Sequence, residues 1–188
     1  MNRNLDYYVL RLPNYIPDEV CDKTLEEVKK FDFREHKFYH RRTDSFENKS
    51  GEQELECTWQ NVSNNNFIME KLWYAIDTYI KEFDFKWFNG WEGYSEPRFN
   101  KYSENKKMHE HCDHIHSLFD GDRKGIPTLS ILGLLNDDFE GGEFVMFEDT
   151  TIEFKKGDLL LFPSNFLFPH RVEPVKKGTR YSYISWSW

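Results

Sequence analysis

From Ser95 to the C-terminus, short runs of apolar and β-branched residues alternate with polar turn residues. The turn signals are Asp120-Gly121, Glu140-Gly141-Gly142, Lys156-Gly157 and Lys177-Gly178. Short alternating runs bounded by such turns are typical of antiparallel strands. We therefore expect eight strands, over residues 98–102, 108–114, 128–135, 143–147, 151–154, 158–162, 168–172 and 180–186. Strands at this spacing favour a jelly roll, in which two antiparallel sheets face each other.

The first half of the chain predicts a mixture of elements. Residues 7–12 have the pattern of a strand, and Pro17-Asp18-Glu19 begins a helix that runs to about residue 30, with acidic residues at its positive end. A second helix is expected over residues 65–83, where apolar residues recur at helical spacing. Residues 34–63 are polar and resemble a long lid-like loop. Helices that precede the strands should cover the outer face of one sheet.

The predicted fold class is thus α+β, mainly β, with a double-stranded β-helix (jelly roll) core and flanking N-terminal helices. Because the chain has 188 residues and no repeat or linker, we expect one domain over residues 1–188. Residues 1–94 would supply the strand, the helices and the lid-like loop, and residues 95–188 the core. Aromatic residues make up 18% of the chain, which suits the interior of such a core.

Charge argues against a nucleic-acid partner. The chain has 25 basic and 33 acidic residues, a net charge of −8, and an acidic protein repels phosphate backbones. One basic stretch runs against this average, from Arg34 to Arg42. It fits either a solvated face or the entrance to a site.

Three cysteines at irregular spacing form neither a disulfide framework nor a CxxC zinc motif, which favours a reducing compartment. The N-terminal segment is too polar for a signal peptide, and no apolar run is long enough to cross a membrane. We expect a cytoplasmic protein without membrane contact. The sequence does not indicate the oligomeric state.

A candidate metal site begins with an H-x-D pair, His111 and Asp113, in a histidine-rich segment. Residues two apart on a strand point to the same face, so an imidazole and a carboxylate can converge there on one ion. Cys112 would point the other way. By itself the pair fits a polar edge strand slightly better than a metal site.

His170 and Arg180 strengthen the metal hypothesis. His170 lies in an apolar context and would complete a triad of two histidines and one carboxylate, which leaves positions open on Fe(II). Zinc hydrolases use the same ligand types. Arg180 follows ten residues later across a turn and can offer two parallel donors to a carboxylate. Ser182 shares a face with Arg180 and offers a hydroxyl.

The stretch from Arg98 to the C-terminus resembles the 2-oxoglutarate/Fe(II) dioxygenase superfamily, in particular the prolyl 4-hydroxylases. The matching features, in order, are Tyr102 nine residues before His111, the H-x-D pair, Leu135-Asn136-Asp137 followed by Glu140-Gly141-Gly142-Glu143, the run Gly157–Pro163, and His170 with Arg180 and Trp186 behind it. Asn14–Cys21 also resembles the entry to the first helix in that family. Residues 34–63 align with nothing in it, and Leu134-Leu135-Asn136 stands where the family often has Tyr-Leu-Asn.

The resemblance implies a role for each matching position. His111, Asp113 and His170 would ligate Fe(II), Arg180 would hold the distal carboxylate of 2-oxoglutarate, and Tyr102 would donate a hydrogen bond to the same cosubstrate. No catalytic residue beyond the metal ligands is implied. The cofactors would be Fe(II), 2-oxoglutarate and O2, with ascorbate as an optional reductant. The product would be a hydroxylated substrate, with release of succinate and CO2.

Several functions remain open from the sequence. A prolyl or other peptidyl residue is the first substrate that the resemblance implies, and a small molecule such as a free amino acid is the second. AlkB-type nucleic-acid demethylation is third, because the arginine-rich pattern after the distal histidine is missing. A non-catalytic, metal-binding cupin-like module and a zinc-dependent hydrolase belong to other classes. Arg180 argues against the module, and the absence of an HExxH glutamate argues against the hydrolase.

Overall fold

The computed structural model describes residues 4–40, 45–47, 54–113 and 126–188. It contains one short 3-10 helix, two α-helices and fifteen strands within these ranges. The helices are η1 (Leu5–Tyr8), α1 (Asp18–Val28) and α2 (Asn65–Phe83). The strands are β1 (Leu10–Leu12), β2 (Arg34–Glu35), β3 (Phe38–His40), β4 (Ser45–Glu47), β5 (Glu56–Thr58), β6 (Arg98–Tyr102), β7 (Met108–His111), β8 (Leu129–Leu134), β9 (Glu140–Gly141), β10 (Phe144–Met146), β11 (Thr150–Ile152), β12 (Leu159–Pro163), β13 (His170–Val172), β14 (Val175–Lys177) and β15 (Arg180–Ser187).

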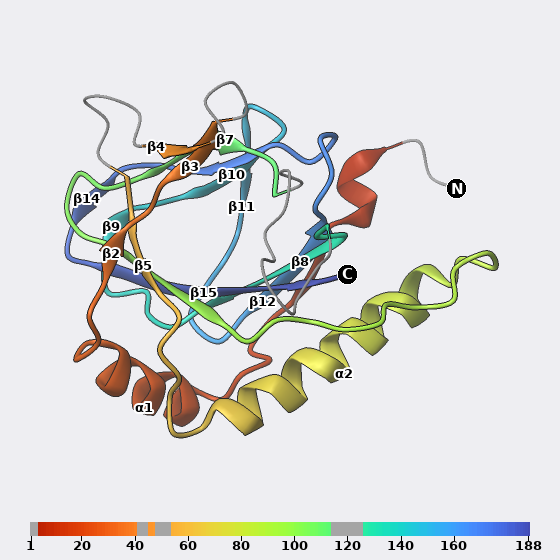
Figure 1. Ribbon diagram of the computed structural model, residues 1–188, viewed down its shortest axis with the longest axis horizontal. Coiled ribbons are helices and arrows are strands. Elements are labelled where there is room, and N and C mark those ends of the chain that lie inside the picture. Colours follow the sequence, from red (N-terminus) through yellow and green to blue (C-terminus); the bar gives the residue numbers. More distant parts are fainter. Residues whose placement is uncertain (1–3, 41–44, 48–53, 114–125) are drawn as a thin grey trace.

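Two antiparallel sheets form the body of the protein (Figure 1). The larger has seven strands in the order β1-β12-β8-β15-β6-β5-β2, and the smaller has four in the order β11-β10-β13-β7. The pairs β14–β9 and β3–β4 form two further short ladders. This mainly β architecture with two helices fits the predicted jelly roll. All eight strands expected after Ser95 are present, and the ends of each expected range differ from those of the described strand by at most three residues.

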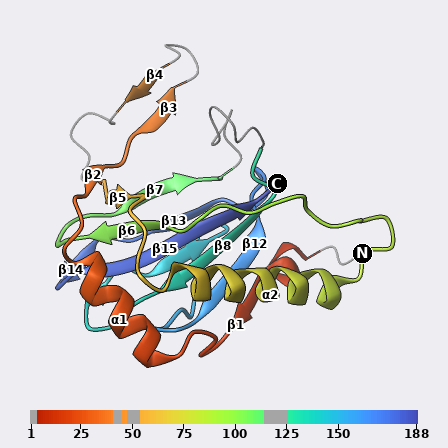
Figure 2. The ribbon, with the colours of Figure 1, turned by 60° about the horizontal axis from the view of Figure 1, so that its bottom comes forward.

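The large sheet separates two apolar cores. Leu159 and Leu161 of β12 face the helices, whereas Leu160 and Phe162 of the same strand face the small sheet. This alternation is the period of two that a strand requires. Both helices therefore cover the outer face of the large sheet, as predicted, with buried side chains of α1 and α2 packed against it (Figure 2).

Two expectations for the N-terminal half were wrong. Residues 7–12 do not form one strand, because the Val9 amide donates to the Asp6 carbonyl (3.0 Å) and closes a 3-10 turn before β1 begins at Leu10. The segment 34–63 is not simply a loop, because β2 and β5 extend the large sheet beyond β6. Residues 41–44 and 48–53 of that segment, and the end of the strand expected over 108–114, lie outside the described residues.

Neither described helix combines the length and apolar character needed to cross a membrane.

Candidate metal and cosubstrate site

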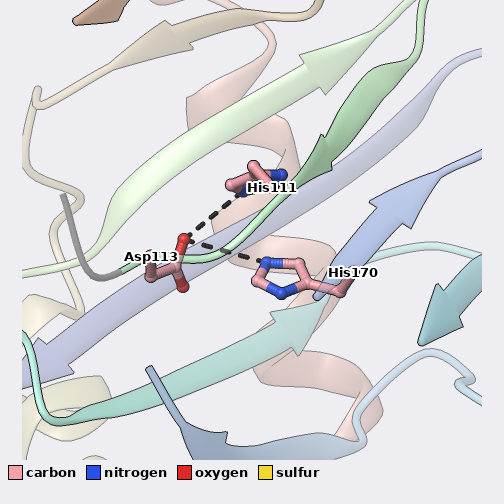
Figure 3. A group of neighbouring side chains, drawn as sticks. All are labelled: His111, Asp113 and His170. Atoms are coloured by element: carbon pink, nitrogen blue, oxygen red, sulfur yellow. Dashed lines mark ion pairs between the residues drawn. The ribbon is translucent and has the colours of Figure 1, made fainter. Parts of the chain in front are cut away.

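The three predicted metal ligands lie together on the inner side of the small sheet. His111 ends β7 and pairs in register with His170, the first residue of β13, so that the two imidazoles face each other with ring centroids 4.3 Å apart. Asp113 follows β7 by two residues. One ligand atom from each side chain lies within 4.8 Å of the other two. Figure 3 shows both rings directed toward the same carboxylate oxygen.

The geometry presents Nε2 of each histidine to a metal. Nε2 of His111 lies 3.4 Å from Oδ1 of Asp113, and Nε2 of His170 lies 3.8 Å from the same oxygen. The opposite nitrogens are engaged by backbone: Nδ1 of His111 lies 2.7 Å from the His109 carbonyl, and Nδ1 of His170 lies 3.1 Å from the Phe168 carbonyl. A carbonyl only accepts, so it fixes the proton on Nδ1 and leaves the Nε2 lone pair for an ion.

Asp113 is held by two buried serines. Its Oδ2 accepts a hydrogen bond of 2.6 Å from Oγ of Ser130, and Oγ of Ser130 lies 2.7 Å from Oγ of Ser164. Burial alone would raise the pKa of Asp113, but the neighbouring His170 and His111 and the hydrogen bond from Ser130 lower it far below its usual range. The carboxylate therefore stays ionised, with Oδ1 directed toward the histidines.

This donor set fits Fe(II). Burial, with a contribution from His111, lowers the pKa of His170 to about 4, so that this imidazole is neutral near pH 7. A neutral imidazole and an ionised carboxylate are the protonation states that metal binding requires. Three protein ligands with nitrogen and oxygen donors leave positions for a cosubstrate and O2, which is the arrangement of non-haem Fe(II) oxygenases.

Arg180 supplies the cation that separates an oxygenase from a simple metal-binding module. It begins β15 and is 1% exposed. Nη1 donates to Oγ of Ser182 (2.9 Å), whereas Nε has no hydrogen-bond partner, and no carboxylate among the described residues pairs with the guanidinium. Burial lowers the pKa of Arg180, because removing a cation from water is costly. A buried guanidinium of this kind is suited to bind an anion that enters from outside.

A cavity of about 210 Å³ reaches Arg180. Leu134, Phe139 and Phe154 contribute apolar walls, and Phe144 lines it as well. The ring of Phe144 also packs against His170, with centroids 5.5 Å apart, so the cavity adjoins the metal ligands. The cavity therefore has a cation at one place and metal ligands beside one wall, which fits 2-oxoglutarate with its two acidic ends.

Comparison with known proteins identifies this half of the chain. The family model of the 2OG-Fe(II) oxygenase superfamily matches residues 97–188. Residues 97–188, just under half of the chain, are therefore similar to the 2OG-Fe(II) oxygenase superfamily. A PKHD-type hydroxylase of Idiomarina loihiensis is 41% identical over 91 residues, which are 46% of this chain and 39% of the relative. A PKHD-type hydroxylase of Aliarcobacter butzleri is 39% identical over 98 residues, 48% of this chain and 42% of the relative. The chain thus spans about two fifths of the curated relatives it matches.

Solved structures of prolyl hydroxylases share the fold over nearly the whole chain. The viral collagen prolyl hydroxylase of Paramecium Bursaria Chlorella virus-1, in complex with 2OG, aligns with a TM-score of 0.68 at 16% identity and covers 96% of this chain and 94% of that one. A prolyl hydroxylase of Trichoplax adhaerens, in complex with a peptide fragment of a hypoxia inducible factor, aligns with a TM-score of 0.69 at 17% identity and covers 96% and 83%. The similarity therefore includes the N-terminal helices as well as residues 97–188.

Tyr102 and Ser182 lie beside Arg180, as the oxygenase pattern predicts. Tyr102 is the register partner of Arg180 on β6, and the guanidinium lies over its ring, 5.0 Å from the centroid. Burial raises the pKa of Tyr102, although Arg180 opposes the effect. Ser182 accepts from Arg180 and keeps its own hydroxyl hydrogen for another acceptor. Hydrogen bonds from Tyr102 and Ser182 to the cosubstrate remain predictions.

The structure adds residues to this oxygenase site that the sequence motifs do not contain. Ser130 is a buried polar position within the apolar strand β8, and Ser164 is a buried polar position directly after β12, which is the one available signal. His36, from the basic stretch, lies near the triad: burial first, and then the charges of Arg98 and His111, lower its pKa to about 3. At least one residue of that stretch therefore faces the site. Nδ1 of His109 lies 2.5 Å from Oε1 of the buried Glu54, and this contact ties the segment before β5 to β7.

Proposed function

We propose that the protein is an Fe(II)- and 2-oxoglutarate-dependent dioxygenase that hydroxylates a prolyl or other peptidyl residue. The observation that carries this proposal is the pairing of a largely buried His-Asp-His triad with a buried guanidinium that has no anionic partner among the described residues. The paired sheets are proposed to form a double-stranded β-helix with the site between them. The peptide-bound prolyl hydroxylase among the structural neighbours supports a peptide substrate.

Each side chain then has a defined task. His111, Asp113 and His170 would hold Fe(II) on one side and leave the remaining positions open. Arg180 would bind the distal carboxylate of 2-oxoglutarate, while Ser182 keeps the guanidinium in place and Tyr102 covers its face. The apolar walls of the cavity would exclude water. Once bound, Fe(II) and 2-oxoglutarate together supply the O2 chemistry, in which one oxygen atom enters the substrate and the other enters succinate as CO2 leaves.

The protein needs no separate acid, base or nucleophile for this reaction. Its contribution is geometric, because it fixes three ligands and one carboxylate anchor on two packed sheets. Replacing Fe(II) with Zn²⁺ distinguishes the proposal from a zinc hydrolase, since zinc should inhibit an oxygenase and support a hydrolase.

An anaerobic titration of the metal-free protein with Fe(II) and 2-oxoglutarate tests the proposal directly. We expect a visible charge-transfer band in the wild type, and for Arg180→Ala either a weaker band or a cosubstrate requirement raised at least about 100-fold, because a buried guanidinium–carboxylate pair with two charged hydrogen bonds is lost. Arg180→Lys keeps the charge and should lie between the two. Arg171→Ala is the control, since Arg171 pairs with Glu110 and Glu173 away from the cavity.

No band from folded wild-type protein would contradict the cofactor assignment. The cupin-like binding module would then become the better description of the site.

A further inference from the structure

A second arginine lies close to the site, and the cosubstrate does not account for it. Arg98 begins β6, where it alternates with Asn100 and Tyr102 on the face toward the small sheet. The intervening Phe99 belongs to the core on the helix side of the sheet. Arg98 therefore points to the same side as Arg180, from the neighbouring strand.

The guanidinium of Arg98 is held in place without being neutralised. Its Nε donates to Oδ1 of Asn100 (3.2 Å), and its carbon Cζ lies 5.1 Å from the ring centroid of Trp186. No carboxylate in the described parts of the chain pairs with it. Arg11 and Arg171, by contrast, each bridge two carboxylates. The two terminal nitrogens of Arg98 thus have no protein acceptor among the described residues.

Only two side chains separate Arg98 from the metal ligand Asp113. Trp186 lies under the guanidinium and is the register partner of Ser130 on β8. Paired residues on one face of an antiparallel sheet are in contact distance. Ser130 in turn donates to Asp113. A group bound to Arg98 would therefore lie on the same inner face as the metal ligands, with the side chains of Trp186 and Ser130 between it and Asp113.

Space for a substrate adjoins this arginine. A groove of about 490 Å³ is lined by residues of β2 and β5 and of the segments next to them, among them Asp32, Cys57 and Trp59. Cys57 pairs in register with Asn100, the residue that holds Arg98. Trp59 is 50% exposed and its ring lies 6.1 Å from that of Trp186, so the two tryptophans connect the groove to the arginine.

Covering Trp186 is not a sufficient explanation for Arg98. An aliphatic side chain would cover the indole equally well, without placing a half-buried cation on the same face of the sheet as Arg180. Orientation by Asn100 and by the indole also restricts the guanidinium before any ligand binds, which lowers the entropic cost of binding. A planar guanidinium held in this way is suited to a bidentate carboxylate.

We propose that Arg98 binds a carboxylate of the substrate before it is hydroxylated. The substrate would therefore carry a carboxylate close to the atom that reacts. This inference rests on the proposed function. Two sources offer the same chemistry: an Asp or Glu side chain near the hydroxylated residue of a peptide, and the α-carboxylate of a free amino acid. Arg180 remains the anchor for 2-oxoglutarate, so the two arginines would bind two different carboxylates.

The test uses the full chain with Fe(II), 2-oxoglutarate and O2. One arm supplies end-blocked peptides with a central proline and varied flanks, in which each Asp or Glu member has an Asn or Gln counterpart. The other arm supplies free amino acids and their amides. The gain of one oxygen atom is followed by mass spectrometry, and KM and kcat are then measured for the preferred probe and its amide counterpart.

We expect the wild type to prefer carboxylate members in one of the two arms. Arg98→Met, which keeps the cover over Trp186, should raise KM for the acidic probe about 10- to 100-fold and leave KM for its amide counterpart unchanged. Arg98→Lys should restore part of the difference. Lys81→Gln, which removes one exposed positive charge on α2, should change neither value.

The affinity for 2-oxoglutarate separates the two proposals. It should be the same in Arg98→Met and wild type, because Arg180 is intact. Failure of the wild type to bind Fe(II) and 2-oxoglutarate would overturn the proposed function itself. The wild type could instead bind both and show no preference for carboxylate members, because charge is irrelevant or because no member reacts. That result would overturn the role of Arg98 and leave the proposed function intact. An equal KM loss for acidic and amide probes in Arg98→Met would overturn it as well.

Discussion

His170 and Arg180 lie on opposite sheets although only ten positions separate them in the chain. His170 begins β13 of the small sheet, and Arg180 begins β15 of the large sheet after the short strand β14. The chain therefore crosses between the sheets at this point, and both side chains are buried in the space between them. Arg180 lines the cavity and His170 packs behind its wall residue Phe144, an arrangement that fits the proposed cosubstrate with its metal-chelating end and distal acid.

Gly142 should be required for the position of Arg180. Its φ of +65° is in the left-handed region, and a Cβ there would lie 3.1 Å from Cδ of Arg180. Gly142→Ala should therefore weaken 2-oxoglutarate binding about 10-fold, because the anchor must shift, in addition to a backbone cost of about 1–2 kcal/mol. Calorimetric titration of the metal-loaded protein with 2-oxoglutarate measures the first effect.

Gly178→Ala is the matched control for backbone strain. Gly178 has a φ of +81°, and a Cβ there would meet the backbone of Asp138 and Phe139 rather than Arg180. It should lose similar or greater stability and keep wild-type affinity for the cosubstrate. Equal loss of affinity in both variants would show that strain, and not the contact with Arg180, matters.

The elements with strong periodicity could be predicted from the sequence. The helix expected over residues 65–83 is observed as Asn65–Phe83, and the strand over 98–102 as Arg98–Tyr102, because one side of each faces an apolar core and leaves a repeating pattern. Residue type and spacing also predicted the triad and Arg180 as candidate site residues, and their roles stay predictions. The described structure brings all four to one place.

The edge of the large sheet and the support of the triad could not be predicted in this way. β2 and β5 join the sheet through backbone hydrogen bonds, which the polar sequence Glu56-Cys57-Thr58 makes as well as an apolar one. Ser130 supports Asp113 across 17 positions in sequence, and a serine in a strand gives no signal of such a partner. Contacts of this kind depend on register, which only the folded chain defines.

Ser130 should orient Asp113 and thereby raise metal affinity. Ser130→Ala removes the donor to Oδ2, so the carboxylate can rotate, and outer-shell losses of this kind typically weaken metal binding about 10- to 100-fold. Fe(II) affinity can be measured anaerobically by competition with a chelator. Ser185→Ala is the control, because Ser185 is also buried and donates to the Ser95 carbonyl (2.6 Å), away from the triad. A similar loss of affinity in both variants would contradict the orienting role.

Asp158 should stabilise the fold and have no direct role at the metal. It is 1% exposed, its Oδ2 accepts from Nε of Arg11 and from the Lys155 amide, and its Oδ1 accepts from the Asn14 amide, each at 2.9 Å. Asp158→Asn places an amide donor among these donors and leaves Arg11 with only Glu153, so we expect a loss of about 3–5 kcal/mol in the free energy of unfolding. Denaturation with urea measures this loss.

Glu153→Gln provides the comparison within the same cluster. Glu153 also pairs with Arg11 (2.8 Å), but its side chain is 61% exposed. Because exposed pairs contribute little, the loss should be much smaller than that of Asp158→Asn. Comparable losses in the two variants would show that burial does not distinguish the two carboxylates.

Cys21 should make the protein less stable at alkaline pH. It is buried on α1, and burial raises the pKa of its thiol to about 12. In the unfolded chain the thiol titrates near its ordinary value, so above about pH 9 the unfolded state loses a proton that the folded state keeps. The stability that Cys21 contributes is therefore complete below pH 8 and should fall by about 1 kcal/mol by pH 10. Urea denaturation of wild type and Cys21→Ala at both pH values measures the loss of stability between pH 8 and pH 10, which should be smaller in the variant.

Cys21 should also resist alkylation in the native protein at pH 8, while the half-buried Cys57 reacts. Rapid labelling of Cys21 in the native protein would contradict both expectations for this residue.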